Sequence, residues 1–383
     1  MHFKKNHGAL LAAALAAAAL LAACGGGGEA APPRAQIEQV YVAGDSLADV
    51  GTFGGVKATI QNSDDPEGFP VFPEIVAQNF GVEDQCNFYV FTGAAFAQNP
   101  TEGCTNFAVG GGSIMNPTAG DPRSIPLQLK TMAQVRGGAW SETDLVVVDG
   151  GGNDAAELVG AYLTAGAGNP APLQGVLLRQ IDGADLAALL GQPDGAAKAA
   201  ALYMKRTADT YYDAIRDNLL AKGATHVAVL NVPDITLTPR FQAVLANVAA
   251  NADPATADAL QDTIHGWIQT FNARLSARVG SDTRIALVDF YADITDEVEN
   301  AASYGLTNAT TPACPVTGVG ADGLPTYDFP TCTSDALDAA PPAGESAGWW
   351  QKWGFSDGFH PTPFAHRLLA SSVSRAIARA GWL

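Results

Sequence analysis

The chain has 383 residues, enough for one large domain or two small ones, and 47% of them are apolar, which is sufficient for a buried core. It carries 39 acidic against 21 basic side chains, a formal net charge of −18. Such a charge repels phosphate backbones, so the composition argues against a nucleic-acid partner, and it otherwise indicates only good solubility.

The first 23 residues predict an export signal. Lys4 and Lys5 precede an apolar run from Ala9 to Ala23. This run is short for a membrane-spanning helix, and it ends in small residues that suit a processing peptidase. We therefore expect residues 1–23 to be removed as a signal peptide.

The segment that ends at Cys24 predicts a lipid anchor. Leu21-Ala22-Ala23-Cys24 resembles a bacterial lipobox, which implies cleavage before Cys24 and a diacylglycerol group on its sulfur. Because Gly25 rather than aspartate follows, the resemblance implies the outer membrane, on its periplasmic or cell-surface face. Residues 24–36 then form a flexible tether rich in Gly, Ala and Pro. The alternative is an ordinary secreted protein in which Cys24 is incidental.

From residue 37 onward, short apolar runs alternate with longer helical patterns, which predicts one α/β domain over 37–383 with helices on both faces of a mainly parallel sheet. The expected strands are Val40–Ala43, Thr105–Ala108, Leu145–Val148, His226–Leu230 and Ile285–Asp289. The expected helices are Phe72–Phe80, Pro126–Val135, Asp154–Leu163, Ala197–Lys222, Ala255–Val279 and Pro363–Gly381. Two stretches rich in turn residues, near 164–194 and 300–348, are expected to be loop insertions.

Four cysteines follow Cys24, an even number in a chain expected to reach an oxidising compartment, so two disulfides are expected. Three pairings are possible. We favour Cys86–Cys104 and Cys314–Cys332 because each closes a short local loop. A zinc site is disfavoured because no two cysteines form a C-x-x-C pair.

Four short segments carry residues suited to catalysis. An apolar strand runs into Gly44-Asp45-Ser46-Leu47, which places a serine hydroxyl at the carboxyl edge of the sheet, where open parallel sheets bind ligands. A strand-ending turn is the alternative. The segment Asn106 to Ser113 contains three consecutive glycines, whose N–H groups can donate to an oxyanion or form only a flexible turn.

The third segment, Gly150 to Asp154, opens a helix with Asn153, which is either a helix cap or a further oxyanion donor. The fourth contains Asp357 and His360. His360 is the histidine in a loop, whereas His226 opens a strand, and His265 and His366 lie on predicted helices. A histidine titrates near neutral pH, and a carboxylate three residues earlier can support its imidazolium form.

Together the four segments resemble the sequence blocks of SGNH/GDSL hydrolases. The blocks are Gly-Asp-Ser-Leu, Asn-Phe-Ala-Val-Gly-Gly-Gly, Gly-Gly-Asn-Asp and Asp-Gly-Phe-His-Pro-Thr. The resemblance spans Val40 to about Ala370 and is nearest the bacterial branch of lipase, phospholipase and haemolysin-like esterases. Asn231-Val232-Pro233-Asp234 and Tyr304-Gly305-Leu306-Thr307-Asn308 add to the likeness.

The resemblance implies a serine esterase or lipase with a flavodoxin-like three-layer α/β/α sandwich, no metal and no cofactor. It implies Ser46 as nucleophile, with Asp357 and His360 completing the triad. The oxyanion donors would be Ser46, Gly111 and Asn153, with Gly110 as the alternative glycine. Its substrate would be a small-molecule or lipid ester, and no protein partner is implied.

Three points stay open at this level. Gly344-Glu345-Ser346-Ala347-Gly348 matches the nucleophile elbow of α/β-hydrolases, but the proline-containing segment before it cannot form a buried strand. The same blocks would serve a polysaccharide acetylesterase or, without catalysis, a ligand-binding lipoprotein. Three tryptophans, Trp349, Trp350 and Trp353, fit an apolar acyl-binding wall or a buried core equally well.

Overall fold

The computed structural model describes residues 35–83 and 85–383. The expected signal peptide, Cys24 and most of the tether lie outside the described residues. Within the described ranges, no helix is both long and apolar enough to cross a membrane.

Four parallel strands form the central sheet, in the order β1 (Gln39–Ala43), β4 (Asp144–Val148), β5 (His226–Leu230) and β6 (Ile285–Val288). Every residue of β4 is buried, as expected for a strand covered on both faces. Four of the five strands expected from the sequence are therefore confirmed.

The fifth expected strand, Thr105–Ala108, is wrong as a strand. The segment lies beside β1 and bonds to it, with the Val42 N–H donating to Thr105 and the Phe107 N–H to Val42, but it forms only an isolated bridge. The reason is the side chain of Asn106, which accepts a hydrogen bond from the Ala108 N–H at 3.0 Å. This local bond turns the backbone away from a regular ladder.

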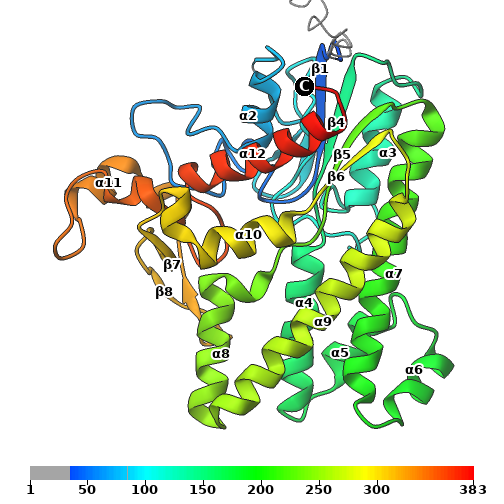
Figure 1. Cartoon of the computed structure of the whole chain (residues 1–383), viewed down its shortest axis with the longest axis vertical. Coiled ribbons are helices and arrows are strands. Elements are labelled where there is room, and N and C mark those ends of the chain that lie inside the picture. The colour runs from blue at the N-terminus through cyan, green and yellow to red at the C-terminus, as the bar shows by residue number, and fades with distance from the viewer. Residues whose placement is uncertain (1–34, 84) are drawn as a thin grey trace, which may run out of the picture. The chain divides into compact units, whose positions relative to one another are not determined.

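Helices cover both faces of the sheet, as Figure 1 shows. One face carries α2 (Phe72–Gln78) and α12 (Pro363–Arg379), which pack on each other. The other carries α3 (Ile125–Val135), α7 (Gly195–Asn218) and α9 (Pro254–Val279). All six expected helices are present within a few residues of their predicted ends. The domain is thus a three-layer α/β/α sandwich.

The first predicted loop insertion, 164–194, is largely helical. After α4 (Gly152–Gly166) come α5 (Ala171–Leu177) and α6 (Gly183–Leu190), which pack against α4 and α7 respectively. Buried leucines and a valine at helical spacing hold these short helices in place, at Leu173, Val176, Leu177 and Leu186. The glycines and prolines that suggested loops lie at helix starts or on exposed faces, where packing overrides propensity.

Two further helices had not been expected, α8 (Pro239–Asn251) and α10 (Phe290–Glu299). In Figure 1, α4 and α8 lie beyond the carboxyl ends of the sheet strands, where the long helices α7 and α9 also extend. These helices therefore stand on the side of the sheet where parallel α/β folds bind ligands.

The second predicted insertion, 300–348, is mostly turns with short elements. They are β7 (Asn308–Pro312), which pairs with β10 (Trp353–Phe355), the hairpin β8 (Gly318–Val319) with β9 (Pro325–Thr326), and α11 (Ser334–Ala339). The remaining elements of residues 35–83 and 85–383 are the hairpin β2 (Tyr89–Phe91) with β3 (Phe96–Gln98) and five 3₁₀ turns, η1 (Leu220–Lys222), η2 (Ile235–Leu237), η3 (Ala301–Tyr304), η4 (Phe329–Thr331) and η5 (Trp349–Lys352).

Both disulfides form as expected, between Cys86 and Cys104 and between Cys314 and Cys332. The second bond lies in a small core that also contains all three of the tryptophans, Trp349, Trp350 and Trp353. These side chains are at most 8% exposed. They therefore belong to a buried core, and the alternative of an acyl-binding wall is wrong.

Candidate active site

Ser46 lies in a tight turn directly after β1, at the carboxyl edge of the sheet. The turn is held from both sides. The buried amide of Gln128, on α3, accepts from the Gly44 N–H at 2.8 Å and donates to the Gly44 carbonyl at 3.0 Å. Asp45 accepts from the Leu47 N–H at 3.0 Å. These bonds fix the direction in which the Ser46 hydroxyl leaves the sheet.

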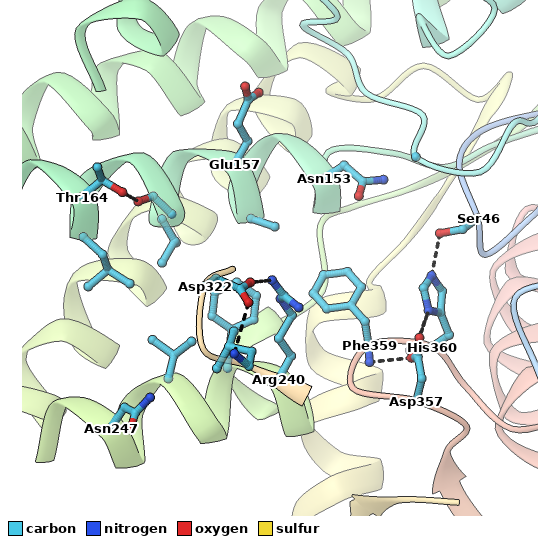
Figure 2. A pocket seen from close by; sticks show the side chains of 18 of the residues that line it. Ser46, Asn153, Glu157, Thr164, Arg240, Asn247, Asp322, Asp357, Phe359 and His360 are labelled. Atoms are coloured by element: carbon cyan, nitrogen blue, oxygen red, sulfur yellow. Dashed lines mark hydrogen bonds and ion pairs between the residues drawn. The ribbon is translucent and has the colours of Figure 1, made fainter. Parts of the chain in front are cut away.

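A continuous hydrogen-bonded chain runs from this hydroxyl to a carboxylate (Figure 2). His360 Nε2 lies 2.8 Å from Ser46 Oγ, and His360 Nδ1 lies 2.9 Å from Asp357 Oδ2. Asp357 Oδ1 also accepts from the backbone N–H groups of Phe359 and His360, each at 2.7 Å. The loop before α12 thereby presents a fixed imidazole to a serine 314 positions away.

The electrostatics of the pair suit a base. Burial alone would lower the pKa of His360, but the charge and hydrogen bond of Asp357 outweigh burial and raise it. Burial would likewise raise the pKa of Asp357, but His360 and the two N–H donors lower it below its ordinary value. Asp357 therefore stays ionised and favours a proton on the imidazole.

A second carboxyl pair lies under the same turn. Asp149, at the end of β4, packs so closely on Gly44 that a Cβ at position 44 would meet its Oδ1 at 1.4 Å. Burial, and then the charge of Asp45, raise the pKa of Asp149 well above its usual range. Burial also raises the pKa of Asp45, and in its protonated form Asp149 can donate a hydrogen bond to Asp45.

Two backbone N–H groups are free beside the hydroxyl. Among the described residues, neither the Ser46 N–H nor the Gly111 N–H has a hydrogen-bond acceptor. The Gly110 N–H, in contrast, donates to Asp49 at 2.8 Å. Gly111 has a φ of 76°, which glycine adopts without strain, and it lines the cavity that contains Ser46. The geometry thus favours Gly111 over Gly110 as a donor to a bound oxyanion.

Asn153 lies in the first turn of α4 and lines the same cavity. Its Nδ2 donates to the Gly112 carbonyl at 2.8 Å and lies 3.4 Å from Asp45 Oδ2. The next residue, Asp154, is buried and accepts from the N–H groups of Ile114 and Met115, each at 2.8 Å. Burial raises the pKa of Asp154 to about 6 despite these bonds. Through its two hydrogen bonds, Asp154 connects the segment that follows Gly110–Gly112 to the helix that carries Asn153.

The sequence patterns predict no role for Gln128, Asp149 or Asp154. Gln128 left one signal, because it is a polar residue on the otherwise apolar face of α3. The roles of Asp149 and Asp154 depend on the loops that they contact, and the local sequence does not indicate those contacts.

The other three histidines of the described residues have structural positions. His265 pairs with Asp234 at 2.9 Å and so joins α9 to the loop after β5. His366 is buried, and its Nδ1 accepts from the Phe72 N–H at 3.3 Å. His226 opens β5, as expected, where burial lowers its pKa. None of the three shares the cavity of Ser46.

Ser346, the serine of the competing motif, is exposed and follows α11 through a turn-rich segment with no strand before it. No described group of three or more His, Cys, Asp or Glu side chains could hold a metal ion. The four described cysteines are engaged in the two disulfides.

The hydroxyl, the imidazole, Gly111 and Asn153 all open into one cavity of about 950 Å³. This volume is at the upper end of the range of small-molecule sites. The cavity continues from Ser46 between α4 and α8, and Figure 2 shows the two helices facing each other across it.

Comparison with known proteins gives one family. The sequence model described as GDSL-like lipase/acylhydrolase matches residues 40–373, nearly the whole of the described domain. No curated protein matches the chain.

Proposed function

The chain belongs to the GDSL-like lipase/acylhydrolase family, and from this premise we propose that it hydrolyses carboxylic esters with Ser46 as nucleophile and His360 as general base. Asp357 orients the imidazole and stabilises its protonated form. The observation that carries the proposal is the unbroken hydrogen-bonded chain from Ser46 through His360 to Asp357 at the mouth of a large cavity.

Acylation transfers the substrate's acyl group to the enzyme. Ser46 Oγ attacks the carbonyl carbon while its proton passes to His360 Nε2. The tetrahedral intermediate collapses, the carbon–oxygen bond to the alcohol breaks, and His360 returns the proton to the departing alkoxide. Water then attacks the acyl-enzyme, gives its proton to His360, and the acid leaves as Ser46 recovers that proton.

The negative oxygen of each intermediate is held by three donors, the N–H groups of Ser46 and Gly111 and the side-chain amide of Asn153. The N–H groups of Ser46 and Gly111 suit this role because neither donates to an acceptor among the described residues. Donors fixed before the reaction stabilise developing charge without having to reorganise.

A fluorophosphonate probe tests the proposal, because only an activated serine reacts with it. We expect one labelled peptide, modified at Ser46, after digestion and mass spectrometry. The same experiment separates the hydrolase from a catalytically silent ligand-binding lipoprotein, which would remain unlabelled. Labelling at another serine would also contradict the assignment.

We further propose that the domain is exported and held at the outer membrane through a lipid on Cys24. Incorporation of an alkyne fatty acid by cells that express the full chain tests this, with Cys24→Ser as the control. An unlabelled wild-type protein in the culture medium would instead indicate the secreted form.

A further inference from the structure

The cavity beside Ser46 extends as a groove with two mainly apolar walls. Successive turns of α4 form one wall, and the facing side of α8 forms the other. The α4 wall contains Ala156, Val159, Gly160 and Leu163 together with Glu157 and Thr164, and the α8 wall contains Phe241, Val244 and Val248 together with Arg240 and Asn247. The apolar side chains that face each other from the two walls suit an aliphatic chain.

The groove is long, and the hairpin β8–β9 contributes to it. From Asn153 to Thr164, α4 advances about 16 Å at about 1.5 Å per residue, close to the length of an extended chain of about a dozen carbons. Leu324 and Asp322 of the hairpin β8–β9 also line the groove, and Asp322 forms an ion pair with Arg240 of α8. Figure 2 shows the pair beside the groove.

The position of the triad indicates which part of an ester enters. The leaving alcohol must lie against His360 Nε2, which gives it a proton. The groove starts from Asn153 and runs along α4, away from the imidazole (Figure 2). The carbonyl substituent that points into it is therefore the acyl chain.

We infer that the groove between α4 and α8 binds the linear aliphatic acyl chain of the substrate, and that Gly160 keeps it open for chains of roughly ten carbons. This inference rests on the proposed ester hydrolysis and adds the substrate class. A Cβ at Gly160 would meet no atom within 4 Å. The glycine is therefore not required by tight packing, and the absence of a side chain leaves space in the groove. A larger side chain there would occupy the space of the acyl chain.

The test varies the acyl chain while the alcohol stays constant. For wild type we expect kcat/KM on p-nitrophenyl esters to rise from acetate to decanoate, because each methylene adds buried apolar surface. In Gly160→Leu, the ratio of kcat/KM for decanoate to that for butyrate should fall at least tenfold. Val244→Trp, which narrows the groove from the opposite wall, should lower the same ratio.

Gly175→Leu is the matched control. Gly175 also lies inside a helix, α5, with no atom within 4 Å of a Cβ, but it does not line the cavity. Its decanoate-to-butyrate ratio should equal that of wild type. An unchanged ratio in both groove variants, or a wild-type preference for acetate, would overturn the inference.

A second series keeps the acetyl group constant and lengthens the alcohol. If Gly160→Leu selectively impairs decyl acetate and spares p-nitrophenyl decanoate, the groove binds the alcohol and the assignment to the acyl chain is wrong. The failure of the proposed function looks different, since wild type would then cleave no ester in either series.

Discussion

His360 Nε2 and Ser46 Oγ lie within hydrogen-bond distance, 2.8 Å, although 314 positions separate the two residues in the chain. Ser46 follows the first strand of the sheet and His360 precedes the last helix, so the contact exists only when the sheet is complete. The proposed chemistry depends on this contact and on its extension to Asp357.

The acid limb of the activity profile should report His360. The imidazole must be neutral to accept the Ser46 proton, and its pKa is raised above 6.5, mainly because Asp357 outweighs the effect of burial. We therefore expect kcat/KM for a neutral ester to rise with pH through a midpoint above 6.5.

Asp357→Asn removes the charge that raises this pKa. The midpoint should move to lower pH, and kcat should fall by roughly three to four orders of magnitude because the imidazolium loses its support. Asp64→Asn, at an exposed carboxylate, serves as the control and should behave as wild type. A midpoint that stays in place in Asp357→Asn would show that another group titrates.

Asn153→Ala should lower kcat by roughly 10²- to 10³-fold, the usual cost of one oxyanion donor, with little change in KM. The exposed Asn251, at the end of α8, provides the control substitution Asn251→Ala. Steady-state kinetics on p-nitrophenyl butyrate measure both. A kcat within threefold of wild type in Asn153→Ala would exclude the amide from the oxyanion site.

Asp149 should stabilise the Ser46 turn by donating a hydrogen bond from its protonated carboxyl group to Asp45. An amide can also donate to Asp45, so Asp149→Asn should keep the Ser46 turn, with near-normal kcat and free energy of unfolding. Asp149→Ala leaves the buried Asp45 without that donor and should cost about 2 kcal/mol of stability as well as activity. Denaturant unfolding and kinetics compare the two, and equal damage in both variants would argue against this hydrogen bond.

Glu297 should make the domain less stable at alkaline pH. Burial, reinforced by the charge of Asp293, raises its pKa to about 8 from an ordinary 4.5. Between these values the folded state holds a proton that the unfolded state has lost, so stability falls as pH rises through this range.

Glu297→Gln stays uncharged and should escape this loss, which we expect to be on the order of 3 kcal/mol in wild type between pH 5 and pH 9. Glu299→Gln, at an exposed position on the same helix, is the control. Parallel pH dependence of the unfolding free energy in wild type and Glu297→Gln would contradict the prediction.

Most strands of the sheet, and the loops that hold the proposed catalytic groups, could be predicted because both leave local signals in the sequence. Buried parallel strands read as apolar runs. Ser46 and the glycines before Ser113 follow such runs, whereas Asn153 and His360 lie where a helix begins. In a parallel sheet the carboxyl ends of the strands meet at one edge, so residues far apart in sequence could be expected together.

The groove could not be predicted in the same way. Its α8 wall lies on a helix that begins with proline and mixes alanine with scattered polar residues, and the nearby α5 and α6 contain glycine or proline that suggests loops. The partners Gln128 and Asp149 come from other elements of the fold, and only the packing of α3 and β4 against the Ser46 turn brings them there.

Replacing the nucleophile tests the central claim most directly, because the chain supplies its own control in the serine of the competing motif. On p-nitrophenyl butyrate, Ser46→Ala should lose at least a thousandfold in kcat while it stays folded, and Ser346→Ala should match wild type. Wild-type turnover by Ser46→Ala, or its loss in Ser346→Ala, would contradict the account.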